Sequence, residues 1–202
     1  MRFKMHTDAC DCPFPVEAVW PRPDSRAGVD WRLIVLGSWL IAVLAQVRIP
    51  IGPVPITGQT LGVLLVGALL GSRQGPLSVA IYLGHGLIGL PVFAGGTTGL
   101  ARMMGPTGGY LVGFVVAALV VGWLSERGWS RRFTTAAAAM VVGNLCVYAV
   151  GLPWLASFTG TRAALRLGLI GFIPGDLLKL LLAAATVSSG WLALSRQRDN
   201  RL

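Results

Sequence analysis

Apolar residues in this chain are gathered into long runs, which are separated by short basic segments or by segments rich in glycine and proline. A transmembrane helix needs about 20 mostly apolar residues, and runs near that length recur along the whole sequence. Six such runs lie at residues 31–47, 59–72, 75–91, 107–124, 134–153 and 173–195. The pattern predicts an all-α membrane protein with six transmembrane helices.

The connections between these runs are of two kinds. Only "SRQG" separates the second run from the third, which predicts a tight hairpin of two short helices, at least one of them short for a full crossing. The segments "RIPIGPVPITGQT" and "GLPVFAGGTTGLARMMGPTGGY" are long, rich in glycine and proline, and still apolar. Irregular backbone at membrane depth is tolerated where it is buried or lines a cavity. We therefore expect ordered outer loops that form the lid and wall of an outward-facing pocket; ordered turns without that role are the alternative.

Composition and charge agree with a membrane location. The chain is 54% apolar and 12% charged, and its mean hydropathy of +0.68 lies outside the range of ordinary soluble domains. Its net charge of +9 comes from cations between the apolar runs and not from a basic, aromatic surface for nucleic acid. With the N-terminus inside, the outer segments hold only Arg48, Arg102, Arg162 and Arg166. This bias predicts a multi-pass protein with an even number of spans and both termini in the cytoplasm.

The ends of the chain are predicted to lie outside the membrane domain. Residues 1–30 have no apolar signal segment and are expected to form a flexible cytoplasmic tail, residues 31–195 the six-helix domain, and residues 196–202 a basic cytoplasmic tail. Cys10, Cys12 and Cys146 make no disulfide framework, and the spacing of His6 with the first two matches no familiar zinc pattern. We expect neither a metal nor a cofactor.

The sequence also bears on the energy source and on catalysis. Its two lysines, Lys4 and Lys179, exclude a phosphate-binding loop of the form GxxxxGK[ST], so any ATP would be used by a partner. An intramembrane peptidase would need a nucleophile with a base in reach, but there is no GxSxG motif, and the only histidines are His6 and His85. We expect no enzyme. A proton-coupled carrier stays an alternative because Asp176 could titrate, although no internal repeat is evident.

Asp176 and Lys179 stand three residues apart in "GDLLK", at the start of the last apolar run. Pro174 suits the beginning of a helix, and an acid in the first turn is favoured by the helix dipole. A helix start with an ion pair on one face would explain the acid but hardly the lysine, which lies deeper toward the bilayer. Ionisable residues inside a membrane mark ligand or ion pathways, so we favour a binding role for both.

Few other polar residues lie in the apolar runs. Asn144 and Tyr148 are four residues apart and share one face of the fifth run, Gln59 opens the second run shortly after Thr57, and Tyr82 lies in the third. Each is a candidate ligand contact, and each could instead make an interhelical hydrogen bond. In the first run, Ser38 and Ala42 have the small-xxx-small spacing that allows close helix approach, either within the chain or to a membrane partner.

The motifs "PVPITGQTLGVLLVGALLG", "GLPVFAGG", "GPTGGYLVGF", "GLPWLA" and "IPGDLLKL" resemble, in this order and spacing, those of the BioY family. These are the biotin-specific substrate-binding (S) components of energy-coupling factor (ECF) transporters. The resemblance covers about residues 31–195. It implies a six-helix bundle that binds biotin near the outer face, under the loop after the first helix.

The resemblance also implies partners, namely a transmembrane (T) coupling protein and a pair of cytoplasmic ATPases. The first helix of such proteins docks through small residues, usually Ala-x-x-x-Ala, and here Ser38 replaces the first alanine. For the ligand, we expect Asp176 to accept a ureido N–H, with Lys179 keeping the carboxylate ionised. Asn144 and Gln59 are the expected amide contacts, and Arg102 or another group of the outer loops is expected to meet the valerate carboxylate at the mouth of the pocket.

Overall fold

The computed structural model describes residues 29–49 and 55–199, and nearly all of them are helical. The helices are α2 (Trp31–Gln46), α3 (Gln59–Leu87), α4 (Leu100–Met104), α5 (Gly108–Glu126), α6 (Phe133–Thr159), α7 (Thr161–Leu165) and α8 (Ile173–Asp199). A 3₁₀ turn, η1 (Trp129–Arg131), precedes α6, and a π-helical segment, η2 (Arg166–Ile170), follows α7. Two short antiparallel strands, β1 (Arg48–Ile49) and β2 (Ile56–Thr57), add a small sheet between α2 and α3.

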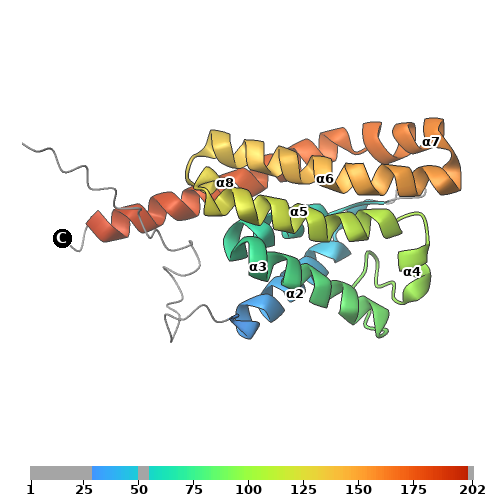
Figure 1. Cartoon of the computed structure of the whole chain (residues 1–202), viewed down its shortest axis with the longest axis horizontal. Coiled ribbons are helices and arrows are strands. Elements are labelled where there is room, and N and C mark those ends of the chain that lie inside the picture. The colour runs from blue at the N-terminus through green and yellow to red at the C-terminus, as the bar shows by residue number, and fades with distance from the viewer. Residues whose placement is uncertain (1–28, 50–54, 200–202) are drawn as a thin grey trace, which may run out of the picture.

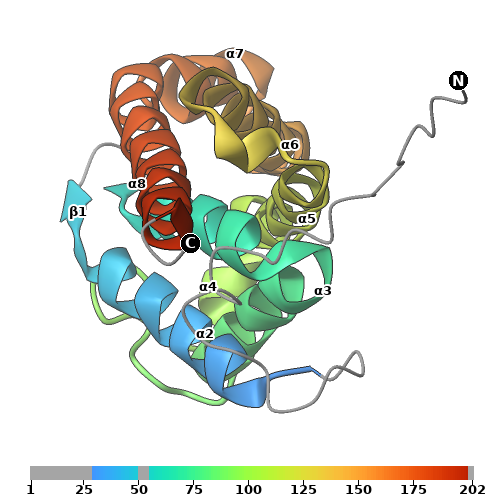
Figure 2. The same ribbon diagram turned by 90° about the vertical axis from the view of Figure 1, so that its left-hand side faces the viewer.

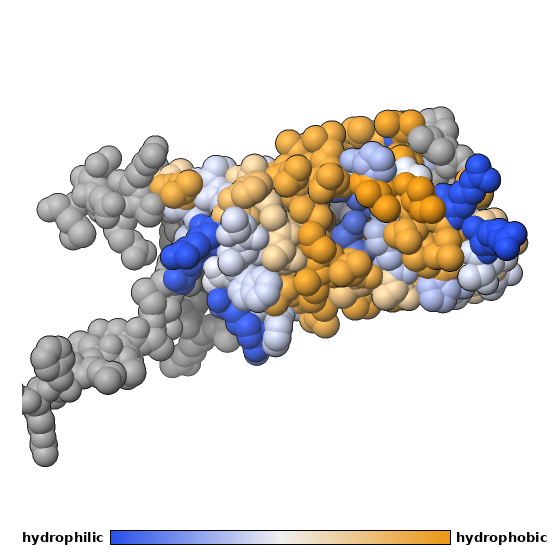
Figure 3. Space-filling view, turned by 90° about the horizontal axis from the view of Figure 1, so that it is seen from above, coloured by the Kyte–Doolittle hydropathy of each residue, from blue (hydrophilic) through white to orange (hydrophobic). Residues whose placement is uncertain are grey.

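The long helices are arranged around a common centre (Figure 2). Along the chain α2, α3, α5, α6 and α8 each contact the next, and α8 also packs against α3. The start of α2 and the end of α8 lie at one end of the molecule, and α4 and α7 lie at the other (Figure 1). Between the two ends, the visible surface is mainly apolar, with hydrophilic residues gathered toward the ends (Figure 3). This distribution is what a protein embedded in a bilayer requires.

Among the described residues, four helices are long and apolar enough to cross a membrane: α3, α5, α6 and Ile173–Ala193 of α8. The six separate helices expected from the sequence are therefore not confirmed as six spans. One reason is that α2, with 16 residues, is shorter than a full crossing. The other is that the second and third expected helices are joined within α3, across a sharp bend at Gly71.

The bend at Gly71 depends on the absence of side chains around it. Gly71 has φ +80°, a conformation that costs an L-residue with a side chain considerably, and the bend brings Gly75 back onto Gly67. A Cβ atom on Gly75 would lie 3.0 Å from the Gly67 Cα. From α5, the Glu126 carboxylate accepts hydrogen bonds from the Ser72 backbone N–H at 2.8 Å and from its hydroxyl at 2.8 and 2.9 Å. The bend is thus fixed from outside by α5.

Two segments near α4 and α7 differ from expectation. The fifth apolar run was expected to end at residue 153, but α6 continues through Pro153 to Thr159, where Gly160 with φ +80° ends it. A proline is tolerated inside a membrane helix when neighbouring groups satisfy the freed backbone. The following residues, expected to be an outer connection, form α7 and the π-helical η2.

The small residues Ser38 and Ala42 of α2 face the interior of the protein. Ser38 is 1% exposed and Ala42 is 6% exposed, and the Ser38 hydroxyl donates to the Val35 carbonyl at 2.8 Å. Beside them, a Cβ atom on Gly37 would lie 2.9 Å from the Ser78 hydroxyl oxygen of α3. The expectation that Ser38 and Ala42 offer an exposed docking face does not hold in this structure, because the close approach they permit is to α3. The exposed face of α2 carries larger residues, among them Leu36, Trp39 and Val43.

The buried side chains form two clusters along the bundle. One is rich in aromatic residues and gathers around Tyr82, Phe93, Tyr110, Tyr148 and Phe172. The other is aliphatic and joins the early part of α6 to the later part of α8, through residues such as Met140 and Val187. Asp176 lies in the first turn of α8, ahead of the aliphatic cluster and at the level of the aromatic one.

Replacing Gly122 by alanine should destabilise the protein, because its Cβ would overlap the Gly71 carbonyl carbon and lie 2.6 Å from the Ser72 nitrogen. Overpacking against backbone costs about 1–3 kcal/mol. We expect a lower melting temperature for Gly122→Ala in detergent or nanodiscs. The matched control is Gly84→Ala in α3, where nothing lies within 4 Å of the added carbon. Equal melting temperatures for the two variants would contradict the tight α3–α5 contact.

Candidate ligand-binding site

A cavity lies between the helices at the end of the molecule that carries α4, and it encloses about 550 Å³ of space, part of it continuous with the outside. Both glycine-rich connections contribute to its wall, the first through Pro55 and Thr57 and the second through Phe93 and Ala94. The remaining lining residues come from α3 to α6 and from the start of α8: Gln59, Thr60, Arg102, Thr107, Tyr110, Leu111, Phe114, Asn144, Val147, Tyr148, Phe172 and Asp176.

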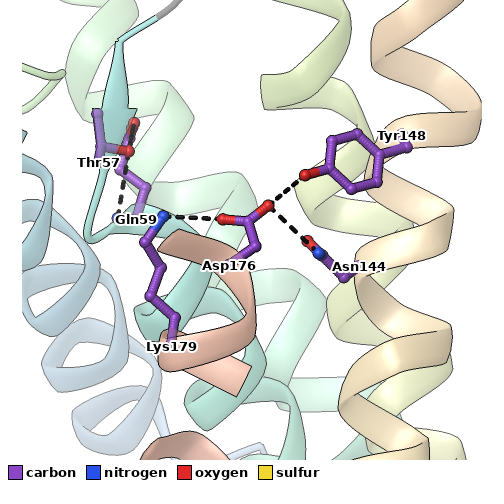
Figure 4. Close-up of polar contacts among 6 residues, drawn as sticks. All are labelled: Thr57, Gln59, Asn144, Tyr148, Asp176 and Lys179. Carbon is purple, nitrogen blue, oxygen red and sulfur yellow. Dashed lines mark hydrogen bonds and ion pairs between the residues drawn. The ribbon is translucent and has the colours of Figure 1, made fainter. Parts of the chain in front are cut away.

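Asp176 is the polar centre of this cavity and is only 6% exposed (Figure 4). Its Oδ1 accepts from the Lys179 ammonium at 2.9 Å, one turn further along α8. Its Oδ2 accepts from the Tyr148 hydroxyl and from the Asn144 side-chain amide, the latter at 3.3 Å, both on α6. A buried carboxylate needs a counter-charge or several donors, and Asp176 has both.

Asn144 contributes a further hydrogen-bond acceptor beside Asp176, its side-chain oxygen. Its Nδ2 donates to Asp176, whereas its Oδ1 is buried and has no hydrogen-bond partner among the described residues. A buried polar atom without a partner costs free energy of about 1–3 kcal/mol, so such an atom calls for an explanation. Because Asn144 lines the cavity, a ligand N–H group would supply the missing donor.

A second polar group links β2 to α3. The Thr57 hydroxyl donates to the Gln59 side-chain oxygen at 2.8 Å, and the Gln59 amide donates to the Tyr82 hydroxyl. Thr57 and Gln59 line the cavity, but Tyr82 lies behind them, edge-on to Phe93 with ring centroids 5.6 Å apart. The Gln59 amide is thereby held by Thr57, which precedes the Gly71 bend in the chain, and by Tyr82, which follows it.

Arg102 lies at the mouth of the cavity in the short helix α4, and Arg48 of β1 is close enough to affect it. Burial lowers the pKa of the Arg102 guanidinium, and the positive charge of Arg48 lowers that pKa further. Within residues 29–49 and 55–199, neither arginine forms a salt bridge. Two cations without an acidic partner favour an anionic group at this mouth.

The structure brings together six of the eight polar residues proposed from the sequence, because Thr57, Gln59, Arg102, Asn144, Tyr148 and Asp176 all line the cavity. Lys179 and Tyr82 do not line it and lie behind, in contact with Asp176 and Gln59. No group of three His, Cys, Asp or Glu residues that could hold a metal occurs in the described part of the chain. His6, Cys10 and Cys12 lie outside the described residues.

The aromatic wall of the cavity was not predicted from the sequence; it is formed by Tyr110, Phe114 and Phe172 together with Phe93. Tyr110 stacks on Phe172 at 6.5 Å with 16° between the rings, and its hydroxyl donates to the Gly168 carbonyl of η2 at 3.1 Å. A Cβ atom on Gly168 would overlap that hydroxyl. The only signal in the sequence was the motif that contains Tyr110, "GPTGGY", where small residues precede an aromatic one.

Comparison with known proteins places this architecture in a family. The profile of the BioY family matches residues 24–196, which is most of the chain. The chain belongs to the BioY family.

Individual members and a solved structure agree with this assignment. The "Probable biotin transporter BioY" of Pyrococcus horikoshii is 42% identical over 73% of this chain and 86% of that protein. The "Biotin transporter BioY" of Thermotoga maritima is 41% identical over 79% of this chain and 89% of that protein. A crystal structure of the S-component for biotin from an ECF-type ABC transporter superposes with a TM-score of 0.72 and 31% identity, covering 78% of this chain and 88% of that one.

These relatives add a functional assignment at the level of the family. BioY proteins are named as transporters, so this chain is a member of a family of multi-pass membrane transporters. The resemblance stated from the sequence motifs is confirmed. The roles of the individual cavity residues still follow only from their geometry.

Removing Lys179 should leave the Asp176 carboxylate buried without its cation, and breaking a buried ion pair from one side costs about 3–5 kcal/mol. We expect Lys179→Met to lower the melting temperature of the ligand-free protein clearly. The double variant Asp176→Asn/Lys179→Met, which removes both charges, should recover much of that loss. Thermal unfolding without ligand measures both. A double variant that is less stable by the sum of the two single losses would contradict an energetically coupled pair.

Proposed function

We infer that this protein is the biotin-binding membrane subunit of a vitamin uptake transporter. The observation that carries this inference is a pair of buried acceptors in one cavity of a BioY-family chain: the Asp176 carboxylate and the Asn144 side-chain oxygen, which has no partner in the described part of the chain. Biotin has two ureido N–H donors one carbonyl apart, a fused sulfur ring, an aliphatic chain and a carboxylate. Each part has a counterpart in the cavity.

The ureido group pairs with the polar centre. We propose that Asp176 accepts one ureido N–H and that Asn144 Oδ1 accepts the other, which would satisfy the buried acceptor. Lys179 lies behind Asp176 and balances its charge, which keeps the carboxylate available as an acceptor. Gln59, held by Thr57 and Tyr82, lines the same cavity and is a second candidate contact for the ligand.

The apolar parts of biotin fit the aromatic wall. Tyr110, Phe114 and Phe172 offer ring faces and edges to the fused bicycle, whose sulfur makes favourable contacts with aromatic rings. Toward the mouth, Arg102 is placed to pair with the valerate carboxylate. A mostly apolar pocket with a few convergent polar groups is typical of small-molecule sites.

The topology and partners complete the proposal. We propose that six segments, counting α3 as two on either side of Gly71, cross the bacterial inner membrane with both termini in the cytoplasm. Residues 1–30 and 196–202 would then be cytoplasmic tails. A transmembrane coupling protein and a pair of cytoplasmic ATPases would supply the energy, because this chain has no phosphate-binding loop. The coupling protein would dock on α2, whose exposed face carries Leu36, Trp39 and Val43 while Ser38 and Ala42 are buried.

Binding can be tested on the purified protein by calorimetry, where we expect tight binding of biotin without ATP and none of thiamine or riboflavin. A hydrogen bond to a charged group is worth about 1.5–3 kcal/mol, so Asp176→Asn should weaken biotin about ten- to a hundredfold. The matched control is Asp30→Asn, which makes the same change at the N-cap of α2. Melting temperature is measured on the same samples. A destabilised Asp176→Asn variant with unchanged affinity would mean that the ion pair serves only the fold.

Dependence on partners can be tested in liposomes. The protein alone should bind biotin but not accumulate it, because it carries no ATP site, and uptake should appear when a coupling protein, an ATPase pair and ATP are added. The amount of biotin retained per protein separates binding from transport. Accumulation by the protein alone that collapses with an uncoupler would instead support a proton-driven secondary carrier.

A further inference from the structure

The segment 92–97, "VFAGGT", forms one wall of the cavity, yet it has no regular structure. Phe93 and Ala94 line the cavity and are almost fully buried, and the Phe93 ring covers Gly86 of α3 so closely that a Cβ there would overlap it. Gly95 and Gly96 both have positive φ, at +72° and +70°. Two consecutive glycines in this region give the backbone many other conformations. A contact with another part of the protein must therefore favour the observed conformation of this segment.

The segment has few backbone hydrogen bonds of its own. The Phe93 N–H donates to the Thr97 carbonyl at 3.2 Å and the Gly96 N–H donates to the Phe93 carbonyl at 3.0 Å, which closes a turn. The Thr97 hydroxyl donates to the Ala94 carbonyl at 3.1 Å within the same turn. These bonds shape the turn but do not fix its position against the bundle.

The last residue of α2, Gln46, makes the connection to the bundle. Its side-chain nitrogen donates to the Ala42 carbonyl of its own helix at 3.1 Å and lies 3.5 Å and 3.4 Å from the carbonyls of Val92 and Phe93. Its side-chain oxygen accepts from the Gly96 N–H at 3.1 Å. One amide thus joins α2 to both sides of the turn. Gln46 does not line the cavity, so it acts on any ligand only through this segment.

We propose that Gln46 is a positioning residue for ligand binding, because it holds Phe93 and Ala94 in the place where they close the cavity wall. The proposal rests on the proposed function, in which biotin occupies this cavity. A neighbouring contact supports it: the Arg48 guanidinium lies over Gly95, where a Cβ would come 2.6 Å from its Nε, so β1 packs on the same turn. Gln46 at the end of α2 and Arg48 at the start of β1 thus both contact residues 92–97 from outside the cavity.

The test uses Gln46→Met, which keeps the length and apolar stem of the side chain and removes both hydrogen-bonding groups. Losing one to two hydrogen bonds of ordinary strength should weaken biotin binding about 5- to 20-fold, through a wall segment that samples other conformations. Amide hydrogen exchange in the ligand-free protein should be faster at Gly96, whose N–H keeps only the Phe93 carbonyl as an acceptor, with the bundle amides and the melting temperature unchanged. The matched control is the exposed neighbour Val47→Ala, which should alter none of these.

A double-mutant cycle with Phe93→Leu tests whether the effect passes through the wall. If it does, Gln46→Met should cost less than about twofold in the Phe93→Leu background, because the ring it positions is gone. Additive losses, or unchanged affinity and Gly96 exchange in Gln46→Met while the wild type binds biotin, would overturn the positioning role and leave the proposed function intact. A wild-type protein that does not bind biotin would overturn both.

Discussion

A carboxylate cannot be placed inside an apolar helix bundle without partners, and the arrangement around Asp176 is the solution that this chain uses. The carboxylate takes a cation from its own helix and two neutral donors from α6, so that three side chains on two helices must be in register. The remaining contacts between α6 and α8 are apolar packing, and a hydrogen bond from the Trp191 indole to the Ser130 hydroxyl ties α8 to the turn before α6. The polar centre therefore fixes how the two helices meet, as well as what the cavity offers.

The other long contacts depend on small residues instead of polar ones. Gly122 lets α5 reach the bend at Gly71, and Gly37 lets α2 reach Ser78 of α3. In a bilayer, where lipid is as apolar as leucine, close backbone approach is a main source of helix association. The bundle thus combines packed glycine contacts with two buried polar groups, one around Asp176 and one around Gln59. The glycine contacts set the spacing between the helices, and the buried polar groups determine which chemical groups the cavity can bind.

Much of the outline could be read from the sequence because its signals are local. Long apolar runs gave helices at the expected places, and the spacing of Asn144 and Tyr148 put both on one helix face, where they meet Asp176. The pairing of Gln59 with Tyr82 could not be predicted, because it depends on how α3 bends at Gly71. A bend angle is set by packing between distant segments, which one sequence does not display.

Two further features were hidden for different physical reasons. The aromatic wall was missed because, in a chain that is 54% apolar, a ring that lines a cavity looks like one that faces lipid. The sequence left open whether Ser38 and Ala42 pack within the chain or face a partner, because helical spacing shows which residues share a face but not where that face points. Polar residues within the apolar runs did indicate the candidate site, because polar side chains are rare in such runs and need hydrogen-bond partners there.

The two arginines near the mouth have a consequence for the speed of binding. Arg48 and Arg102 repel one another and form no salt bridge within the described residues, so their field extends outward from the mouth. An anion that diffuses toward the protein is drawn along that field before it touches any wall residue. Added salt screens the field, and it then slows association more than it speeds departure, because the contacts deep in the cavity are shielded from ions. Under the proposed function, the mouth would thus govern how often a carboxylate ligand arrives, whereas the polar centre around Asp176 would govern how long it stays.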